Sequence, residues 1–337
     1  MSTSLKPTLA RIAQGETLSA TEAQAAFGVI MDGQATPAQI GGLLMAMRTR
    51  GETVPELTGV VSALRQRMAR VEAPAGAIDV CGTGGDGAAS LNISTAVTFV
   101  LTACGVPVAK HGNKALSSRS GGADVLTALG IGIEPPPERL AHILQQVGCV
   151  FLFAPRHHPA LRHAASVRVE LGTRTIFNLT GPLANPACVT RQLMGVYDKK
   201  WLLPVAETLR DLGSEAVWVV HGGGMDELIL EGENDVVSLK NGTIHSFSIK
   251  AEDAGLAPSP ACALQGGDAA YNAAALLALL RGEPGAYRDT VLLNAAAALV
   301  MAERAHTLPQ GVDCAAQAID NGVALAVLER LKTACEV

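Results

Sequence analysis

A dense glycine cluster directly after a short apolar segment constrains the fold of this chain more than any other feature. Residues 77–80 are apolar except for Asp79, and four glycines follow between positions 82 and 87. Glycine adopts backbone conformations that other residues avoid, so the main-chain N–H groups of such a loop can converge on one point. A strand that ends in this loop, with a helix beginning near Ile93, predicts a phosphate-binding site at the edge of a sheet.

Three alternative interpretations of this loop are weaker. Gly82, Gly84 and Gly87 fit the G-x-G-x-x-G pattern of dinucleotide-binding folds, but the next strand ends in Lys110, where that fold needs an acidic residue for the ribose. No Lys-Ser or Lys-Thr follows the glycines, which excludes a P-loop nucleotide-binding site. An ordinary tight turn explains the glycines but not the polar residues that surround the following helix start.

Strand and helix patterns alternate through most of the remaining sequence. Short apolar segments predict strands near 106–109, 149–153, 192–196 and 216–220, and helical patterns occur near 93–104, 122–129 and 137–147. A hairpin that turns at Asn241-Gly242 and alanine-rich helices at 269–280, 290–304 and 314–331 complete the series. Such alternation predicts an α/β fold with a mostly parallel central sheet that is covered by helices.

The first 74 residues predict a separate helical domain. Ser19 with Glu22 and Thr53 with Glu56 form capping-box patterns, and Thr36-Pro37 is a further helix start. Residues 71–76 are typical of a linker. We therefore expect a helical domain over 1–74, joined by helices from about 137 to 172, and an α/β domain over 75–136 and 173–337.

Composition and charge exclude several classes of function. The net charge of −5 gives no general attraction to nucleic acid or to anionic membranes. The sequence contains no uninterrupted stretch of 18 apolar residues and no signal-peptide pattern. Its seven cysteines are scattered, with no C-x-x-C pair. We expect a cytoplasmic protein that acts on small molecules and contacts neither membranes nor nucleic acid.

A second donor-rich segment follows the strand predicted at 106–109. It runs from Lys110 to Ser118 and offers lysine, asparagine and serine donors. The carboxyl ends of parallel strands lie at one edge of a sheet, where ligands of open α/β folds bind. Both loops should therefore face one crevice, and a ligand with phosphate groups at two ends would suit them.

Several long motifs together resemble the anthranilate phosphoribosyltransferase family. They are residues 82–86, 92–95, 110–113, 168–178, 181–186 and 221–227, and the resemblance covers nearly the whole chain. It implies the two-domain fold of nucleoside phosphorylases and these phosphoribosyltransferases, and it implies a homodimer. The implied activity is transfer of the phosphoribosyl group from phosphoribosyl pyrophosphate to the amine of anthranilate, in tryptophan biosynthesis.

The resemblance also implies roles for individual residues. For phosphoribosyl pyrophosphate they are Gly82, Gly85, Asp86, Ser90, Asn92, Ile93, Ser94, Thr95, Lys110, His111, Gly112, Asn113, Lys114, Ala115, Leu116, Ser117, Ser118 and Gly122. For anthranilate they are Gly82, Asn113 and Arg168, and for two magnesium ions they are Ser94, Asp226 and Glu227. A guanidinium group matches a planar carboxylate, and hydroxyl and carboxylate oxygens suit Mg²⁺. A catalytic role for His111 stays open.

Simpler structural interpretations compete with some of these roles. Asp226 and Glu227 could form a solvated turn. Arginines recur at 162, 168 and 174, so any of them could be a surface cation. His157 and His158, with His163, could suggest a metal site, but no ligand of suitable spacing accompanies them, and we expect exposed histidines beside a helix that starts at Pro159.

Two other functions fit parts of the pattern. A pyrimidine nucleoside phosphorylase would share the fold but should lack the 168–186 segment as written. A non-catalytic nucleic-acid-binding relative would need a basic face, which the net charge does not favour. The sequence also departs from the family pattern: Gly122 and Ser90 replace a usual serine and threonine, and Thr180 replaces a leucine. Gly122 removes one hydroxyl donor from the expected site.

Overall fold

The computed structural model describes residues 4–115 and 119–336. Its N-terminal part is a cluster of helices. Its members are α1 (Lys6–Ile12), α2 (Ala20–Met31), α3 (Pro37–Arg50) and α4 (Val54–Arg67). The predicted start signals are confirmed. The Ser19 hydroxyl accepts the N–H of Glu22 at 3.3 Å, and the Glu22 carboxylate accepts the N–H of Ser19 at 2.9 Å. Glu56 accepts the N–H of Thr53 at 3.0 Å.

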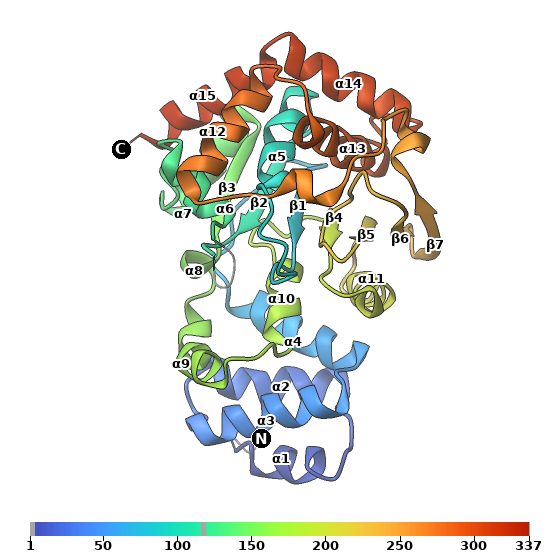
Figure 1. The fold of residues 1–337 in the computed structure, drawn as a ribbon. Helices are drawn as coiled ribbons and strands as arrows, with labels where there is room; N and C mark the ends of the chain where they lie inside the picture. Colours follow the sequence, from blue (N-terminus) through green and yellow to red (C-terminus); the bar gives the residue numbers. More distant parts are fainter. Residues whose placement is uncertain (1–3, 116–118, 337) are drawn as a thin grey trace.

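A seven-stranded sheet organises the rest of the described chain (Figure 1). Its strands are β1 (Ile78–Gly82), β2 (Val108–Gly112), β3 (Cys149–Phe153), β4 (Arg191–Gly195), β5 (Ala216–Gly222), β6 (Asn234–Lys240) and β7 (Thr243–Ile249), in the order β3-β2-β1-β4-β5-β6-β7. The first five strands of this order run parallel, and β6 and β7 are antiparallel. The β6–β7 hairpin turns at Asn241 and Gly242, both with positive φ, as predicted.

Helices cover both faces of the sheet, because alternate strand residues point to opposite sides. One face carries α5 (Ile93–Ala103), α12 (Ala269–Leu280), α13 (Ala286–Met301), α14 (Leu308–Asp320) and α15 (Val323–Cys335). The other carries α10 (Phe177–Leu183), α11 (Leu202–Asp211) and α4. In β5, Val217 and Val219 pack with the second layer, and Val220 packs with the first. None of the described helices is long and apolar enough to cross a membrane.

Two element assignments differ from the sequence prediction. Of the helices between about 137 and 172, α7 (Pro137–Val147) packs on β3 and α15 and so lies with the sheet, whereas α9 (Arg162–Leu171) packs on α2 and α3. The helix expected over 314–331 is two helices, α14 and α15. The chain turns between them at Gly322, whose φ of +77° ends the helical path.

The strand order reverses beside β1. The chain passes from β1 to β2 and β3 on one side of β1, and then crosses to β4 on the other side. Ligands of open α/β sheets bind outside the carboxyl ends of the strands at such a switch point. This topology places the loop after Gly82 at the expected binding position.

Candidate active site

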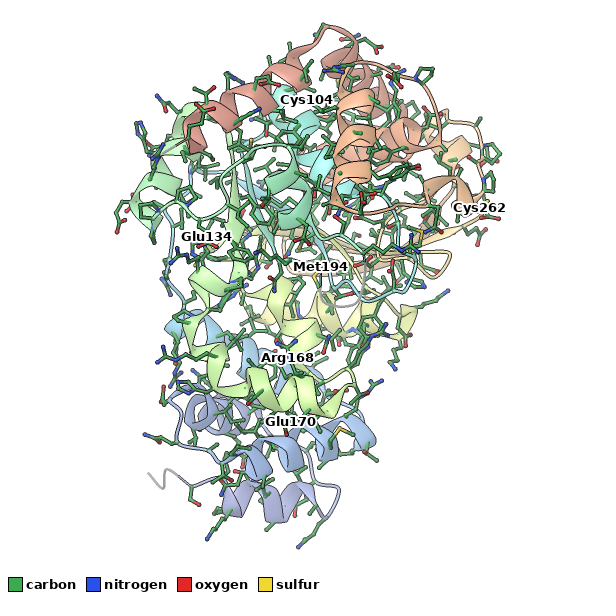
Figure 2. All side chains as sticks on the ribbon, turned by 60° about the vertical axis from the view of Figure 1, so that its left-hand side comes forward. Cys104, Glu134, Arg168, Glu170, Met194 and Cys262 are labelled. Atoms are coloured by element: carbon green, nitrogen blue, oxygen red, sulfur yellow. The ribbon has the colours of Figure 1, made fainter. Side chains whose placement is uncertain are left out.

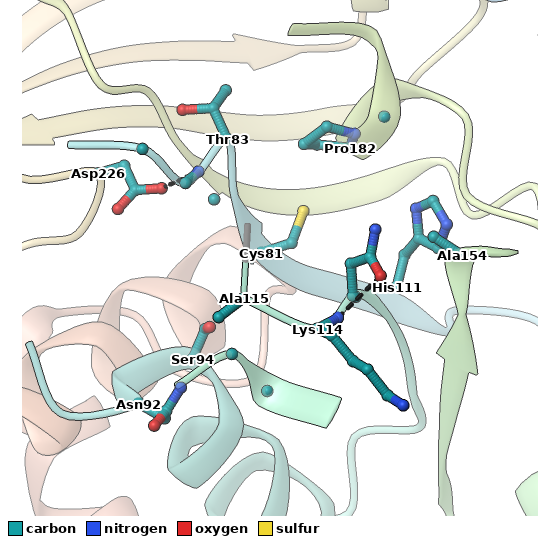
Figure 3. A pocket seen from close by; sticks show the side chains of 18 of the residues that line it. Cys81, Thr83, Asn92, Ser94, His111, Lys114, Ala115, Ala154, Pro182 and Asp226 are labelled. Carbon is teal, nitrogen blue, oxygen red and sulfur yellow. Dashed lines mark hydrogen bonds between the residues drawn. The ribbon is translucent and has the colours of Figure 1, made fainter. Parts of the chain in front are cut away.

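One cavity of about 340 Å³ opens at this switch point, between the sheet and the helical part of the chain (Figure 3). The predicted site residues that line it are Gly82, Gly85, Asp86, Ser90, Asn92, Ile93, Ser94, Thr95, Lys110, His111, Gly112, Asn113, Lys114, Ala115, Gly122, Arg168, Asp226 and Glu227. Leu116, Ser117 and Ser118 lie outside the described residues. Segments far apart in sequence therefore meet around a single space.

The first loop takes a path that requires glycine. Gly84, Gly85 and Gly87 have φ values of +66°, +74° and +82°, which other residues rarely adopt. The N–H of Gly84 donates to Oδ2 of Asp226 at 2.6 Å, as Figure 3 shows. The loop leads into α5 through Asn92, so main-chain donors and a helix N-terminus face the same cavity.

Asp226 occupies space that two paired strand ends leave empty. Gly82 of β1 and Gly195 of β4 are direct partners in the sheet. A Cβ atom on Gly82 would overlap the Asp226 carboxylate, and one on Gly195 would overlap the Asp226 main chain. Both strands therefore need glycine at this position for the carboxylate to reach the first loop. Gly195 is a residue that the sequence interpretation did not single out.

Asp226 and Glu227 form an electrostatically costly pair. Burial, repulsion from Asp86 and the neighbouring carboxylate raise the pKa of Asp226 and of Glu227 above their ordinary values. Glu227 also accepts the N–H of Ser94 at 3.3 Å. Two carboxylates and a hydroxyl are the hard oxygen donors that Mg²⁺ prefers, and a cation would relieve their repulsion. The hydrogen bonds of the pair to Gly84 and Ser94 join it to the first loop, and its chemistry fits the expected metal.

The protein supplies only part of a metal shell. Within residues 4–115 and 119–336, no group of three or more His, Cys, Asp or Glu side chains is arranged to hold a metal ion. Mg²⁺ takes about six oxygen ligands and often keeps waters and substrate phosphate oxygens among them. An ion here would need oxygens from a bound phosphate compound to complete its shell.

Lys110 is a strand residue and not part of the loop that follows. The strand predicted at 106–109 extends to Gly112, because Lys110 and His111 pair with Phe151 and Leu152 of β3. The Lys110 ammonium group donates to the carbonyl oxygen of Val80 at 2.6 Å and to the hydroxyl of Ser94 at 3.0 Å. The buried lysine thus joins the ends of β1 and β2 to the start of α5.

A buried carboxylate fixes the backbone beneath the cavity. Asp79 of β1 is fully buried and accepts the N–H of His111 at 3.1 Å and the amide of Asn185 at 2.8 Å. Burial raises the pKa of Asp79, while nearby Lys110 and these hydrogen bonds lower it. In the sequence Asp79 stands out only as a polar residue in an apolar strand, whereas its hydrogen bond to His111 joins β2 to β1.

The expectation of exposed histidines near Pro159 is wrong. His157 and His158 are 1% and 5% exposed, and Nδ1 of His157 lies 2.8 Å from the carbonyl oxygen of Ala69. His158 lies beside His111, with 5.1 Å between ring centroids and 58° between the ring planes. Burial lowers the pKa of His158 to about 4 and also lowers the pKa of His111. Both rings are therefore neutral near pH 7, and they form one wall of the cavity.

Arg168 is the arginine of the three that reaches the cavity. It projects from α9 above the ring of Phe177, 5.5 Å from its centroid, and burial lowers its pKa. Figure 2 shows Arg168 where the blue N-terminal helices meet the sheet domain. In the described part of the chain no carboxylate forms an ion pair with Arg168, so its charge is available to a ligand. Arg162, on the same helix, is exposed.

Arg174 and several apolar residues are functional candidates that the sequence analysis did not identify. The Arg174 guanidinium stacks on Tyr197, 4.1 Å from the ring centroid. A Cβ atom on Gly85 would lie 3.4 Å from Nε of Arg174, so the first loop passes directly beside this cation. Phe151, Phe177 and Pro182 supply flat apolar walls. No sequence pattern marks them as ligand contacts, because their positions depend on packing between distant segments.

Gly122 lies directly beside Thr95 in the cavity wall. A Cβ atom on Gly122 would lie 3.1 Å from the hydroxyl oxygen of Thr95. The usual serine of the family pattern would fit here only after a small adjustment of Thr95. Gly122 is the first residue of α6 (Gly122–Ala128), so the missing hydroxyl lies beside the start of α5.

Family models match both parts of the chain. Residues 75–325 match the model described as glycosyl transferase family, a/b domain. Residues 6–68 match the model described as glycosyl transferase family, helical bundle domain. Together these two matches account for most of the sequence.

Individual relatives are similar over nearly their whole length. A protein from Mesorhizobium japonicum named anthranilate phosphoribosyltransferase is 58% identical over 327 residues, which is 97% of each chain. The crystal structure of anthranilate phosphoribosyltransferase from Thermus thermophilus is 41% identical, with a TM-score of 0.92 over 98% of this chain and 99% of that one. The Saccharomyces cerevisiae enzyme in complex with phosphoribosyl pyrophosphate and Mg is 25% identical, with a TM-score of 0.89 over 99% of each chain.

Proposed function

The chain belongs to the anthranilate phosphoribosyltransferase family, and we propose that the cavity described above carries out the family's reaction with the residues that line it. In that reaction the anomeric carbon of phosphoribosyl pyrophosphate forms a bond to the amine nitrogen of anthranilate. The bond to the pyrophosphate oxygen breaks, and the products are N-(5-phosphoribosyl)anthranilate and pyrophosphate. The amine loses one proton in the process.

The phosphate-bearing substrate is assigned to the two donor-rich loops. Main-chain N–H groups of the Gly82–Gly87 region and the N-terminus of α5 would receive the pyrophosphate. Lys110 and the segment that follows β2 would receive the ribose 5-phosphate region. The Lys110 ammonium group has three N–H donors, and the bonds to Val80 and Ser94 use two of them, so one donor is left for the ligand. When bound, Mg²⁺ would be held by Ser94, Asp226 and Glu227 and would supply positive charge to the leaving pyrophosphate.

Arg168 carries the assignment of the second substrate. It is a partly buried cation in an apolar wall, with no ion-pair partner among the described residues, and it lies across the cavity from the phosphate loops. A planar carboxylate fits a guanidinium group through two parallel hydrogen bonds. The flat ring of Phe177 beneath it suits an aromatic acid. Arg168 would therefore orient anthranilate so that its amine faces the anomeric carbon.

The chemistry needs little acid–base catalysis from the protein. An aromatic amine is already neutral near pH 7, so attack does not depend on a strong general base. Most of the rate enhancement would come from holding the two substrates together and from stabilising charge that separates in the transition state. His111 is a neutral ring at the edge of the site and is assigned no proton transfer.

A direct assay tests this function. Purified protein is incubated with anthranilate, phosphoribosyl pyrophosphate and Mg²⁺, and loss of anthranilate fluorescence and release of pyrophosphate are followed together. Both signals should appear only when all three components are present. A parallel reaction with a pyrimidine nucleoside and inorganic phosphate tests the phosphorylase alternative. Phosphorolysis there, without loss of anthranilate fluorescence, would contradict the proposal.

Several finer statements belong to the same proposal. Two magnesium ions, a homodimer and a role in tryptophan biosynthesis follow from the family resemblance. A cytoplasmic location is supported by the seven scattered cysteines, which contain no C-x-x-C pair. The division into a helical domain over 1–74 and an α/β domain is supported by the ranges of the two family models. The packing of α7 on β3 supports including that helix in the α/β domain.

A further inference from the structure

A buried asparagine on α12 contacts the phosphate loop from behind. Asn272 is 1% exposed and lies in the first turns of α12, about 180 residues after the loop in sequence. Its amide nitrogen donates to Oδ1 of Asn92 at 2.8 Å, and its Oδ1 accepts the N–H of Gly267 at 2.8 Å. Asn92 lines the cavity, whereas Asn272 does not. The contact therefore acts on the site indirectly.

The hydrogen bonds fix which way both amides point. A main-chain N–H can only donate, so Gly267 requires the oxygen of Asn272 on its side. The Asn272 nitrogen then faces Asn92 and requires the oxygen of that amide. The nitrogen of Asn92 is left on the far side, where it lies 3.4 Å from the carbonyl oxygen of Ser120. One obligatory donor at Gly267 thus determines that Asn92 presents its NH₂ group towards the cavity and the second loop.

The backbone of Asn92 is held from the same side. The hydroxyl of Tyr287, which is 9% exposed on α13, donates to the carbonyl oxygen of Asn92 at 3.0 Å. The segment before Gly267 also contacts the loop, because the N–H of Gly266 donates to the carbonyl oxygen of Ala89 at 2.9 Å. Ala89 has a φ of +47°. A non-glycine residue in this conformation has a higher conformational free energy, so it keeps the conformation only where its surroundings hold it. The last third of the chain therefore forms a rigid support for the first loop.

We propose that Asn272 is a positioning residue that orients the Asn92 amide as a donor to phosphoribosyl pyrophosphate and couples the two phosphate loops. The ligand in this statement rests on the proposed function, but the orientation of Asn92 does not. α12 packs on α6, which begins beside the second loop, so one helix contacts both sides of the phosphate site. The same geometry predicts that Asn272 influences the phosphate substrate and not anthranilate.

A double-mutant cycle tests the coupling. Asn272→Ala should raise the KM for phosphoribosyl pyrophosphate about tenfold and leave the KM for anthranilate within twofold. Asn92→Ala should raise the KM for phosphoribosyl pyrophosphate at least as much. In the double variant, Asn272→Ala should cause no further increase in this KM, because Asn272 acts through Asn92. Additive effects, or equal increases in both KM values, would overturn the proposal.

Two further variants separate positioning from stability. Asn272→Asp keeps the volume and the acceptor for Gly267 but presents an oxygen to Oδ1 of Asn92, so its KM for phosphoribosyl pyrophosphate should rise as in Asn272→Ala. Thr208→Val removes a buried hydroxyl that bonds within α11, away from both loops. It should lower the melting temperature with both KM values unchanged. An Asn272→Asp variant with wild-type kinetics would contradict the proposed amide orientation.

A ligand-free measurement distinguishes this inference from the proposed function. The side-chain NH₂ resonances of Asn92, assigned by their loss in Asn92→Ala, should form one sharp pair in the wild-type protein. Asn272→Ala should shift or broaden that pair, because the amide can then rotate. Unchanged resonances would overturn the positioning role even if the enzyme is active. If Asn272→Ala alters these resonances but the wild-type protein fails to bind phosphoribosyl pyrophosphate, the proposed ligand is wrong and the positioning of Asn92 by Asn272 is still supported.

Discussion

The carboxylate of Asp226 lies over Gly82, in the space where a side chain would otherwise stand, and it accepts the N–H of Gly84 at 2.6 Å. The turn after β5 is thereby attached to the loop after β1, across the intervening strand β4. This attachment brings two carboxylates to the loop that we propose as the phosphate site. Like charges so placed would be favourable there only if a cation accompanied the phosphate, so the proposal puts the metal and the phosphate substrate at one place.

Neutralising Asp226 and Glu227 should lower the activity without destabilising the fold. The double variant Asp226→Asn/Glu227→Gln keeps the shape of both side chains and can still accept the N–H of Gly84. We expect a higher Mg²⁺ requirement and lower turnover, measured as activity against Mg²⁺ concentration. A normal Mg²⁺ activation curve would assign the metal to other residues.

The same pair predicts how stability depends on pH without metal. Both carboxyl groups ionise near pH 4 in the unfolded chain, and their pKa values are raised in the folded protein. Between the unfolded and the folded pKa values the folded state binds more protons than the unfolded state, so the free energy of unfolding decreases as pH rises. The double variant should lack this decrease and be more stable than the wild type near pH 8. Urea denaturation of metal-free protein at pH 5 and pH 8 measures the difference.

Gly85→Val should abolish binding of phosphoribosyl pyrophosphate while the protein stays folded. Gly85 has a φ of +74°, and a side chain there would approach Arg174 and fill space that phosphate oxygens need. Gly76→Val is a matched control, because Gly76 has a φ of +76° in a turn with no atom within 4 Å of a Cβ. Each change should cost on the order of 1–2 kcal/mol of stability. Calorimetry should show lost binding for Gly85→Val alone.

Arg168→Ala should weaken the use of anthranilate and spare phosphoribosyl pyrophosphate. A hydrogen bond to a charged group is worth roughly 1.5 to 3 kcal/mol, which corresponds to an increase of about ten- to a hundredfold in the KM for anthranilate. Arg162→Ala, on the exposed face of the same helix, should change neither KM. Equal losses for both substrates in Arg168→Ala would indicate that this arginine is structural.

The loops and the acidic pair could be predicted because they follow strands of a parallel sheet. Because residues 77–80 and 216–220 are predicted as strands, the topology of such sheets places the loop at Gly82 and the turn at Asp226 at one edge. Glycine clusters and carboxylates also limit the chemistry that can occur there. The sequence therefore predicts that the acidic turn and the first loop face one crevice.

Other features depend on contacts that sequence patterns do not contain. The end of β2 is set by its pairing with Phe151 and Leu152, which moves Lys110 from the loop into the strand. α7 is amphipathic, but its pattern does not indicate whether β3 or the N-terminal helices cover its apolar face. Asn272 approaches Asn92 from a helix about 180 residues later in the chain. Only the assembled fold identifies such partners.

The burial of His158 predicts an acid-sensitive fold. Its pKa is lowered to about 4 by burial and by neighbouring His157, and the ring also faces His111, whose pKa is lowered too. In the unfolded chain a histidine has a pKa near 6.5. Between pH 6.5 and 4 the unfolded state therefore binds more protons, so stability is complete above pH 6.5 and is lost as pH falls through this range. Each pKa unit corresponds to about 1.4 kcal/mol, which limits the loss from this residue to about 3 kcal/mol.

A comparison of variants isolates the His158 contribution from the opposite trend of the carboxylate pair. His158→Gln removes the titrating ring, and His142→Gln alters an exposed histidine on α7 as a control. The difference in unfolding free energy between wild type and His158→Gln should shrink by up to about 3 kcal/mol from pH 7 to pH 4, whereas His142→Gln should follow the wild type. Urea denaturation at four pH values provides the measurement. Parallel curves for wild type and His158→Gln would mean that His158 is protonated without cost, and that the wall it forms beside His111 opens to water in solution.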